Sequence, residues 1–143
     1  MRIALVAASL VLVAGGAVGC GGGGDKGDSA PTNASKSDFC SSIATFFKDE
    51  AAVDTSTDTK TQIKKAKDEI EKLSKVGTPS GMPSDARKGY ETFINAIEKV
   101  DDNASKSDLE NFDKKLSATD QKNLTAFITY VGTECPEALG GAS

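Results

Sequence analysis

The chain has 143 residues and carries 17 Lys and Arg against 21 Asp and Glu, for a formal net charge of −4. This length suits one domain with a single hydrophobic core. The acidic balance argues against a nucleic-acid partner and against electrostatic binding to anionic lipid headgroups.

The N-terminus has the three parts of a bacterial export signal. Arg2 supplies the positive charge, residues 3–13 form an apolar run, and residues 14–19 are mostly small. A transmembrane helix needs about 20 apolar residues, and this run has roughly half of them, so we do not expect a membrane span. We therefore predict that residues 1–19 are a cleaved signal peptide.

The end of this segment, Ala17-Val18-Gly19-Cys20, resembles the lipobox of bacterial lipoproteins. The cysteine of a lipobox becomes the acylated first residue of the mature chain, so the resemblance implies that Cys20 carries acyl chains such as palmitate. Burial of such chains in a bilayer anchors a protein without a basic patch. The alternative is that the same small residues form an ordinary cleavage site and release a soluble secreted protein.

Residues 20–36 continue from this cysteine into four glycines and a polar stretch. A segment without large apolar side chains cannot offset the entropy lost on ordering, so we predict a flexible tether. The remaining residues, 37–143, form the predicted folded domain.

Apolar residues at spacings of three and four predict that this domain is helical. Four main helices are expected at 38–53, 59–76, 84–101 and 119–134. A capping-box pattern that starts at Ser107 predicts one short helix before the last. Because no segment alternates in the manner of a strand, we predict an all-α, up-and-down bundle of four main helices plus one short helix.

Two short segments of the domain are identical. Residues 33–38 and 103–108 both read NASKSD, and each precedes a predicted helix. We interpret the recurrence as common helix-start chemistry rather than as an ancestral repeat, since the similarity does not continue.

Three cysteines are an odd number for an exported protein, in which thiols usually pair. If Cys20 carries lipid, Cys40 and Cys135 remain as one pair. Cys40 lies near the start of the first predicted helix and Cys135 at the end of the last, so an up-and-down bundle brings them together. We expect a disulfide, with two unpaired buried thiols as the alternative.

Few residues offer catalytic or metal-binding chemistry. The chain has no His, which removes the commonest general base and zinc ligand. No G-x-S-x-G or S-x-x-K pattern marks a serine nucleophile. The aromatic residues at helical spacing, Phe46, Phe47, Phe93 and Phe127, are predicted to belong to the core. We therefore expect no enzyme activity, cofactor or metal.

A set of residues spread over the domain carries a further resemblance. It comprises Phe39-Cys40, Thr78-Pro79, Met82-Pro83, Asp85-Ala86-Arg87, Gly89-Tyr90-Glu91, Phe93, Phe127, Tyr130 and Cys135. The pattern resembles small actinobacterial lipoproteins that combine a lipobox, a Gly-rich tether and a helical domain with a Cys near each end. The resemblance implies a location, a fold and a disulfide, and no catalytic or binding residue.

Together these features predict a lipid-anchored protein on the extracytoplasmic face of the cell membrane. Its expected role is that of a non-enzymatic binding module for another protein of the cell envelope. The alternative is a carrier of a small apolar or lipid ligand, because bundles can open a cavity between their helices. The expected cavity would be lined by Phe47, Tyr90, Phe93 and Phe127.

Overall fold

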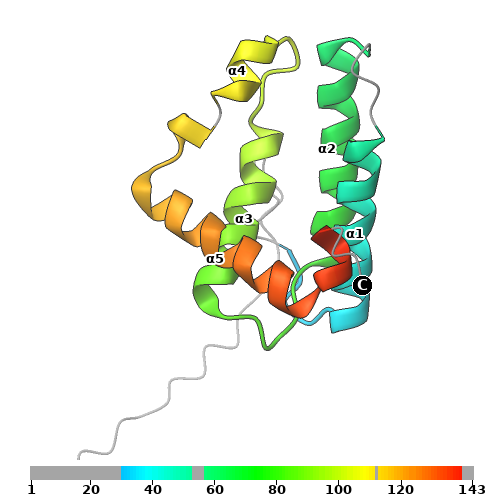
Figure 1. The fold of residues 1–143 in the computed structure, drawn as a ribbon, viewed down its shortest axis with the longest axis vertical. Coiled ribbons are helices and arrows are strands. Elements are labelled where there is room, and N and C mark those ends of the chain that lie inside the picture. Colours follow the sequence, from blue (N-terminus) through cyan, green and yellow to red (C-terminus); the bar gives the residue numbers. More distant parts are fainter. Residues whose placement is uncertain (1–29, 53–56, 112, 140–143) are drawn as a thin grey trace, which may run out of the picture.

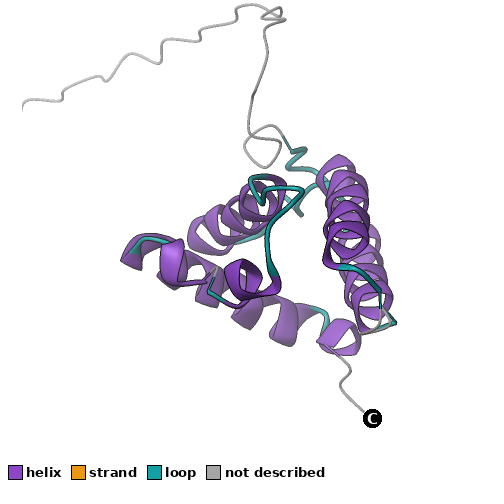
Figure 2. Cartoon of the chain, turned by 90° about the horizontal axis from the view of Figure 1, so that it is seen from above, coloured by secondary structure: helices purple, strands orange, loops and turns teal. Residues whose placement is uncertain are grey.

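Helices make up most of the described residues. The computed structural model describes residues 30–52, 57–111 and 113–139. The long helices are α1 (Lys36–Ala51), α2 (Thr59–Val76), α3 (Ser84–Glu98) and α5 (Ala118–Glu134), and the shorter elements are α4 (Lys106–Glu110) and the 3₁₀ turns η1 (Asp113–Lys115) and η2 (Pro136–Leu139). Figure 2 shows helices and loops, without a strand in the described residues. The predicted all-α bundle is confirmed.

The long helices alternate in direction along the chain, as expected of an up-and-down bundle (Figure 1). α1 and α2 lie side by side, and α5 crosses α3 obliquely in the most extensive helix contact of the described part. The start of α1 and the end of α5 meet at one end of the bundle, while α4 lies at the opposite end.

Serine side chains begin three of the helices in the same way. The hydroxyl oxygens of Ser35, Ser105 and Ser117 each accept a hydrogen bond from the backbone N–H three residues further on. This cap satisfies an N–H group that has no partner within the helix. The two NASKSD segments thus place the same serine at a helix start, in agreement with our interpretation of the recurrence.

The predicted cap of the short helix is wrong by two residues. Ser105, and not Ser107, is the N-cap of α4, and its backbone N–H donates to the Asp108 carboxylate at 3.0 Å. In the sequence, Ser105 with Asp108 and Ser107 with Glu110 both fit the capping-box pattern. The first pair forms the box, since the Asp108 carboxylate accepts a hydrogen bond from the Ser105 backbone N–H.

A cluster of aromatic side chains fills the centre of the bundle. Phe39, Tyr90 and Phe127 are fully buried, and the rings of Tyr90 and Phe127 lie edge to face at 5.7 Å. The Tyr90 hydroxyl donates to the Leu73 carbonyl at 2.7 Å, which satisfies the one polar atom of this ring. An added Cβ at Gly89 would lie 2.0 Å from the Asn123 carbonyl oxygen. Glycine at this position therefore permits the close approach of α3 and α5.

The folded domain begins earlier than predicted. Residues 30–35 were expected in the tether, yet the Thr78 N–H donates to the Pro31 carbonyl at 2.8 Å and the Ala34 N–H donates to the Thr78 carbonyl at 3.1 Å. Gly77 has a φ of 76° and contacts the Pro31 carbonyl, leaving no room for a side chain. The docking depends on this tertiary contact, which the polar composition of the segment does not reveal.

Candidate functional site

The predicted lipidation site, Cys20, lies outside the described residues, as do residues 1–19 and the first part of the predicted tether. Its acylation stays a prediction. In the described part of the chain, no helix is both long enough and apolar enough to span a bilayer.

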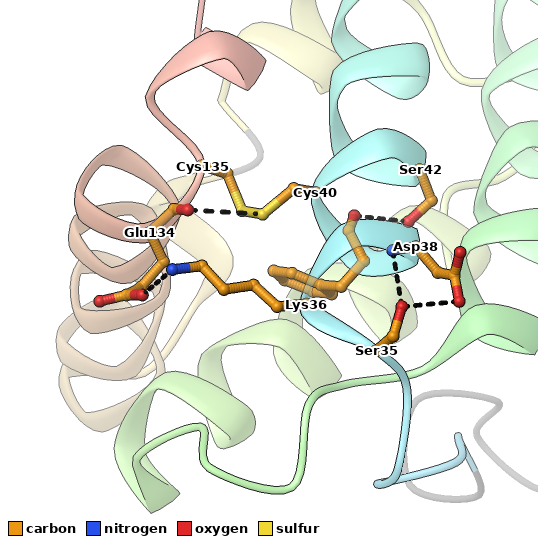
Figure 3. Close-up of a disulfide and its surroundings, with 8 residues drawn as sticks. Ser35, Lys36, Asp38, Cys40, Ser42, Glu134 and Cys135 are labelled. Carbon is orange, nitrogen blue, oxygen red and sulfur yellow. Dashed lines mark hydrogen bonds and ion pairs between the residues drawn. A yellow bond between two sulfur atoms is a disulfide. The ribbon is translucent and has the colours of Figure 1, made fainter.

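The predicted cysteine pair forms a disulfide, drawn in Figure 3. Cys40 in the first turns of α1 and Cys135 at the end of α5 are 95 residues apart in sequence, and their Cα atoms are 5.3 Å apart. This Cα separation is in the usual range for a disulfide. The bond therefore joins the two ends of the domain, and the alternative of two free thiols is not observed.

An ion pair between Lys36 and Glu134 lies beside the disulfide (Figure 3). The Lys36 Nζ atom donates to the Glu134 carboxylate at 2.5 Å, and this contact raises the pKa of Lys36. The Cys40 sulfur lies 3.6 Å from the Glu134 carbonyl oxygen. This is a contact only, since a disulfide sulfur has no proton to donate. A groove of about 470 Å³ runs along this end, and of its three charged side chains, Lys36, Glu134 and Glu137, the first two are paired with each other.

The aromatic residues predicted to line a ligand cavity make close contacts with other rings. Phe93 contacts Phe46 with ring centroids 5.3 Å apart and Phe127 with centroids 5.8 Å apart. Phe46 and Phe127 are buried, while Phe47 and Phe93 are partly buried against the same core. The prediction that these four rings belong to the core is confirmed. Of the four residues expected to line a cavity, Tyr90 and Phe93 each pack against Phe127, while Phe47 packs against Phe46.

A different cleft, of about 250 Å³, opens near the other end of the bundle. It lies where the end of α1, the start of α2, the end of α3 and α4 come together. Its walls are mainly aliphatic, with two polar residues: Ile63, Ala66, Ile97, Val100 and Leu109, together with Glu50 and Gln62. Ligand sites are typically apolar clefts with a few polar groups, so this cleft is the better candidate site.

Glu50 is the unusual residue of this cleft. Its Oε1 atom is shielded from solvent and has no hydrogen-bond partner in the described part of the chain. Desolvation raises the pKa of Glu50, the nearby Lys65 lowers it, and the carboxylates of Glu69 and Asp49 raise it further. A shielded acceptor without a donor is costly, and native structures contain few of them.

The neighbouring donors are engaged elsewhere. The Lys65 Nζ atom donates to the Asp49 backbone carbonyl at 3.1 Å, and the Gln62 Nε2 atom donates to the Thr57 carbonyl at 2.8 Å. Neither of these donors bonds to the shielded Oε1 atom of Glu50, which stays without a hydrogen-bond partner in the described part of the chain.

Sequence reasoning missed this site, although one signal was present. Ile43, Phe46 and Glu50 are spaced by three and four residues, so the carboxylate continues the apolar stripe of α1. An acidic residue in a core-facing position marks a polar group that folding brings into contact with apolar surface.

Metal binding has no support in the described residues, in which no three His, Cys, Asp or Glu side chains gather to hold an ion.

No protein-family model matches the chain, and neither the curated proteins nor the solved structures that were searched include a match. The resemblance to actinobacterial lipoproteins stays a prediction.

Proposed function

We propose that this protein is a lipoprotein, held by acylated Cys20 on the extracytoplasmic face of the cell membrane. Its helical domain acts there as a non-enzymatic binding module of the cell envelope. One observation carries the proposal. The disulfide uses two of the three cysteines and leaves Cys20 as the remaining one, at the junction of a leader-like segment and a glycine run.

Two further considerations support this location. Structural disulfides persist in oxidising compartments outside the cytoplasm, where an export signal would deliver the chain. The first described residue, Ala30, follows Cys20 by ten positions. A chain of that length, even fully extended, reaches at most roughly 35 Å, so an anchored domain would work close to the membrane surface.

Metabolic labelling with a clickable fatty acid tests the anchor. The wild-type protein is expected to incorporate the label and to fractionate with membranes. Cys20→Ala removes the acceptor thiol and is expected to abolish both the labelling and the fractionation with membranes. The matched control, Cys40→Ala with Cys135→Ala, retains Cys20 and should still be labelled. Equal labelling of wild type and Cys20→Ala would refute the anchor.

The interaction role is tested by photo-crosslinking in cells that carry the anchored protein. Exposed positions on different helices accept a photoreactive residue without disturbing the core: Lys48, Lys64, Lys88 and Ile128. We expect one position to capture a defined envelope protein and the positions on other helices to capture much less. An absence of specific adducts from all four would count against a protein partner.

The second candidate function is carriage of a small ligand, and the cleft around Glu50 favours it. The cleft is lined by aliphatic side chains together with Glu50 and Gln62. Native mass spectrometry of protein purified from the cell envelope should then reveal a bound small molecule that Glu50→Gln fails to retain.

A further inference from the structure

The N-terminal segment 30–35 is fastened to the bundle at a defined place. The Thr78 N–H donates to the Pro31 carbonyl at 2.8 Å, and the Ala34 N–H donates to the Thr78 carbonyl at 3.1 Å. The Arg87 guanidinium holds the same loop by donating to the Thr78 hydroxyl at 2.7 Å. The segment therefore meets the domain at the end of the bundle where α1 begins, α2 ends and α3 begins (Figure 1).

The segments that meet there contain no charged residue. Residues 30–35 and 76–84, which together form the neutral end of the bundle, have no Asp, Glu, Lys or Arg, in a chain of which 27% is charged. The lysines that follow them in space, Lys36 and Lys75, are each paired with a carboxylate. At the opposite end, residues 98–110 carry five acidic and two basic side chains. The exposed residues of the neutral end include Pro31, Thr32, Asn33, Ser80, Gly81 and Pro83.

We propose that the neutral end faces the membrane surface and that the acidic end, with α4, points away from it. The partner of the neutral end is the layer of lipid headgroups in which the chain is anchored. This inference rests on the proposed anchor at Cys20 and adds to it the orientation of the domain.

The length of the chain before the docked segment favours this orientation. Ten positions separate Cys20 from Ala30, and a flexible Gly-rich chain of that length has an r.m.s. span of roughly 16–19 Å. Helix α2 has 18 residues and is therefore about 27 Å long. With the acidic end on the membrane, the ten residues would have to extend back along the bundle, which exceeds their r.m.s. span.

Charge acts in the same direction. A bilayer that contains anionic lipid repels acidic side chains that come within about a Debye length, roughly 10 Å at 0.1 M salt. The neutral end avoids this repulsion. Residues 98–110 would instead bring their excess of acidic side chains to the headgroups.

The test attaches the anchor chemically, so it does not depend on acylation in cells. In the mature chain with the Cys40–Cys135 disulfide intact, Cys20 is the free thiol, and it is coupled to a maleimide lipid. The lipid is held in nanodiscs of phosphatidylcholine and phosphatidylglycerol in equal parts. A gadolinium chelate on the headgroups enhances the relaxation of nearby amide protons, and this effect falls steeply with distance. We expect the enhancement at Thr32, Asn33, Ser80 and Gly81 to exceed that in α4 at least fivefold.

One pair of variants tests the docked segment. The Cβ added by Gly77→Ala would lie 2.0 Å from the Pro31 carbonyl oxygen, so this variant should release the segment and reduce the difference between the two ends at least twofold. Gly81→Ala adds the same methyl group where nothing lies within 4 Å and is the matched control.

A second pair of variants tests the role of charge. Ser80→Glu with Gly81→Glu places two negative charges on the neutral end and should reduce the enhancement there at least twofold. Ser80→Gln with Gly81→Gln has nearly the same shape without the charges, and it should keep the wild-type profile.

Equal enhancement at the two ends of the wild-type protein, or a greater enhancement in α4, would overturn the proposal. An unchanged profile in Gly77→Ala or in the Glu variant would also overturn it. The wild-type comparison needs no variant, so it remains decisive if a substitution prevents folding. Fatty-acid labelling in cells without the difference in nanodiscs would refute the orientation and keep the anchor, whereas the difference without labelling would refute the anchor alone.

Discussion

Removal of the Cys40–Cys135 disulfide is predicted to cost this domain a large part of its stability. The bond joins residues that are 95 positions apart, so it restricts the conformations of nearly the whole domain in the unfolded state. Its loss removes that restriction. In the chain-entropy model, a loop of this length corresponds to about 4.7 kcal/mol at 25 °C. Measured losses are often smaller than this value, so we expect the free energy of unfolding to fall by about 2–4 kcal/mol. The total free energy of unfolding of a domain is typically roughly 5–15 kcal/mol.

The assay is urea denaturation of the mature chain with Cys20→Ser, comparing the oxidised protein with the Cys40→Ala, Cys135→Ala variant. Reduced protein that keeps both cysteines shows the effect of losing the bond without the effect of substituting the side chains. If the bond is responsible, the reduced protein and the double variant should lose similar free energy of unfolding. The bond-free chains should also show a larger denaturant slope, because their unfolded state exposes more surface.

The neighbouring ion pair supplies a control for this experiment. Lys36 and Glu134 are both solvent-exposed, and exposed ion pairs contribute little. Lys36→Met should therefore leave the unfolding midpoint nearly unchanged. A difference of less than about 1 kcal/mol between oxidised and reduced protein would refute the view that this bond constrains the unfolded chain.

Three further predictions concern the core and the cleft. Gly89→Ala should destabilise the domain by at least about 2 kcal/mol in urea denaturation, because its Cβ would overlap the Asn123 carbonyl and outweigh the gain in helix propensity. Tyr90→Phe should cost about 1 kcal/mol by the same assay, since it removes the bond to the Leu73 carbonyl. Folding raises the pKa of Glu50, so wild-type stability should fall as pH rises from the unfolded to the folded pKa of this carboxyl. Glu50→Gln should abolish that fall in a pH series of thermal unfolding, matching wild type below the window and exceeding it above. Unchanged stability of Gly89→Ala or Tyr90→Phe, or an identical pH profile for Glu50→Gln, would contradict the corresponding contact.

The long helices were predictable because their signals are local. The segment 59–76 shows the period of an amphipathic helix, is preceded by a capping aspartate and is followed by Gly77, and α2 has these same bounds. The disulfide was also predictable, since an up-and-down bundle places the start of its first helix beside the end of its last.

Other features depend on contacts between distant segments. The docking of residues 30–35 rests on backbone hydrogen bonds to Thr78, to which the polar composition of that segment gives no clue. The sequence predicts that the aromatic residues belong to the core and leaves cavity walls as the alternative, and the ring distances show which of them pack against one another. The Glu50 cleft requires four elements to meet, which periodicity within any one of them does not reveal.

The intact mass of the mature protein, isolated from its native membrane, tests the central claim most directly. The account predicts a polypeptide whose first residue is Cys20, heavier than its sequence by the mass of the attached acyl groups, with Cys40 and Cys135 still bonded. A chain that starts at another residue, or that starts at Cys20 with no added mass, would contradict it.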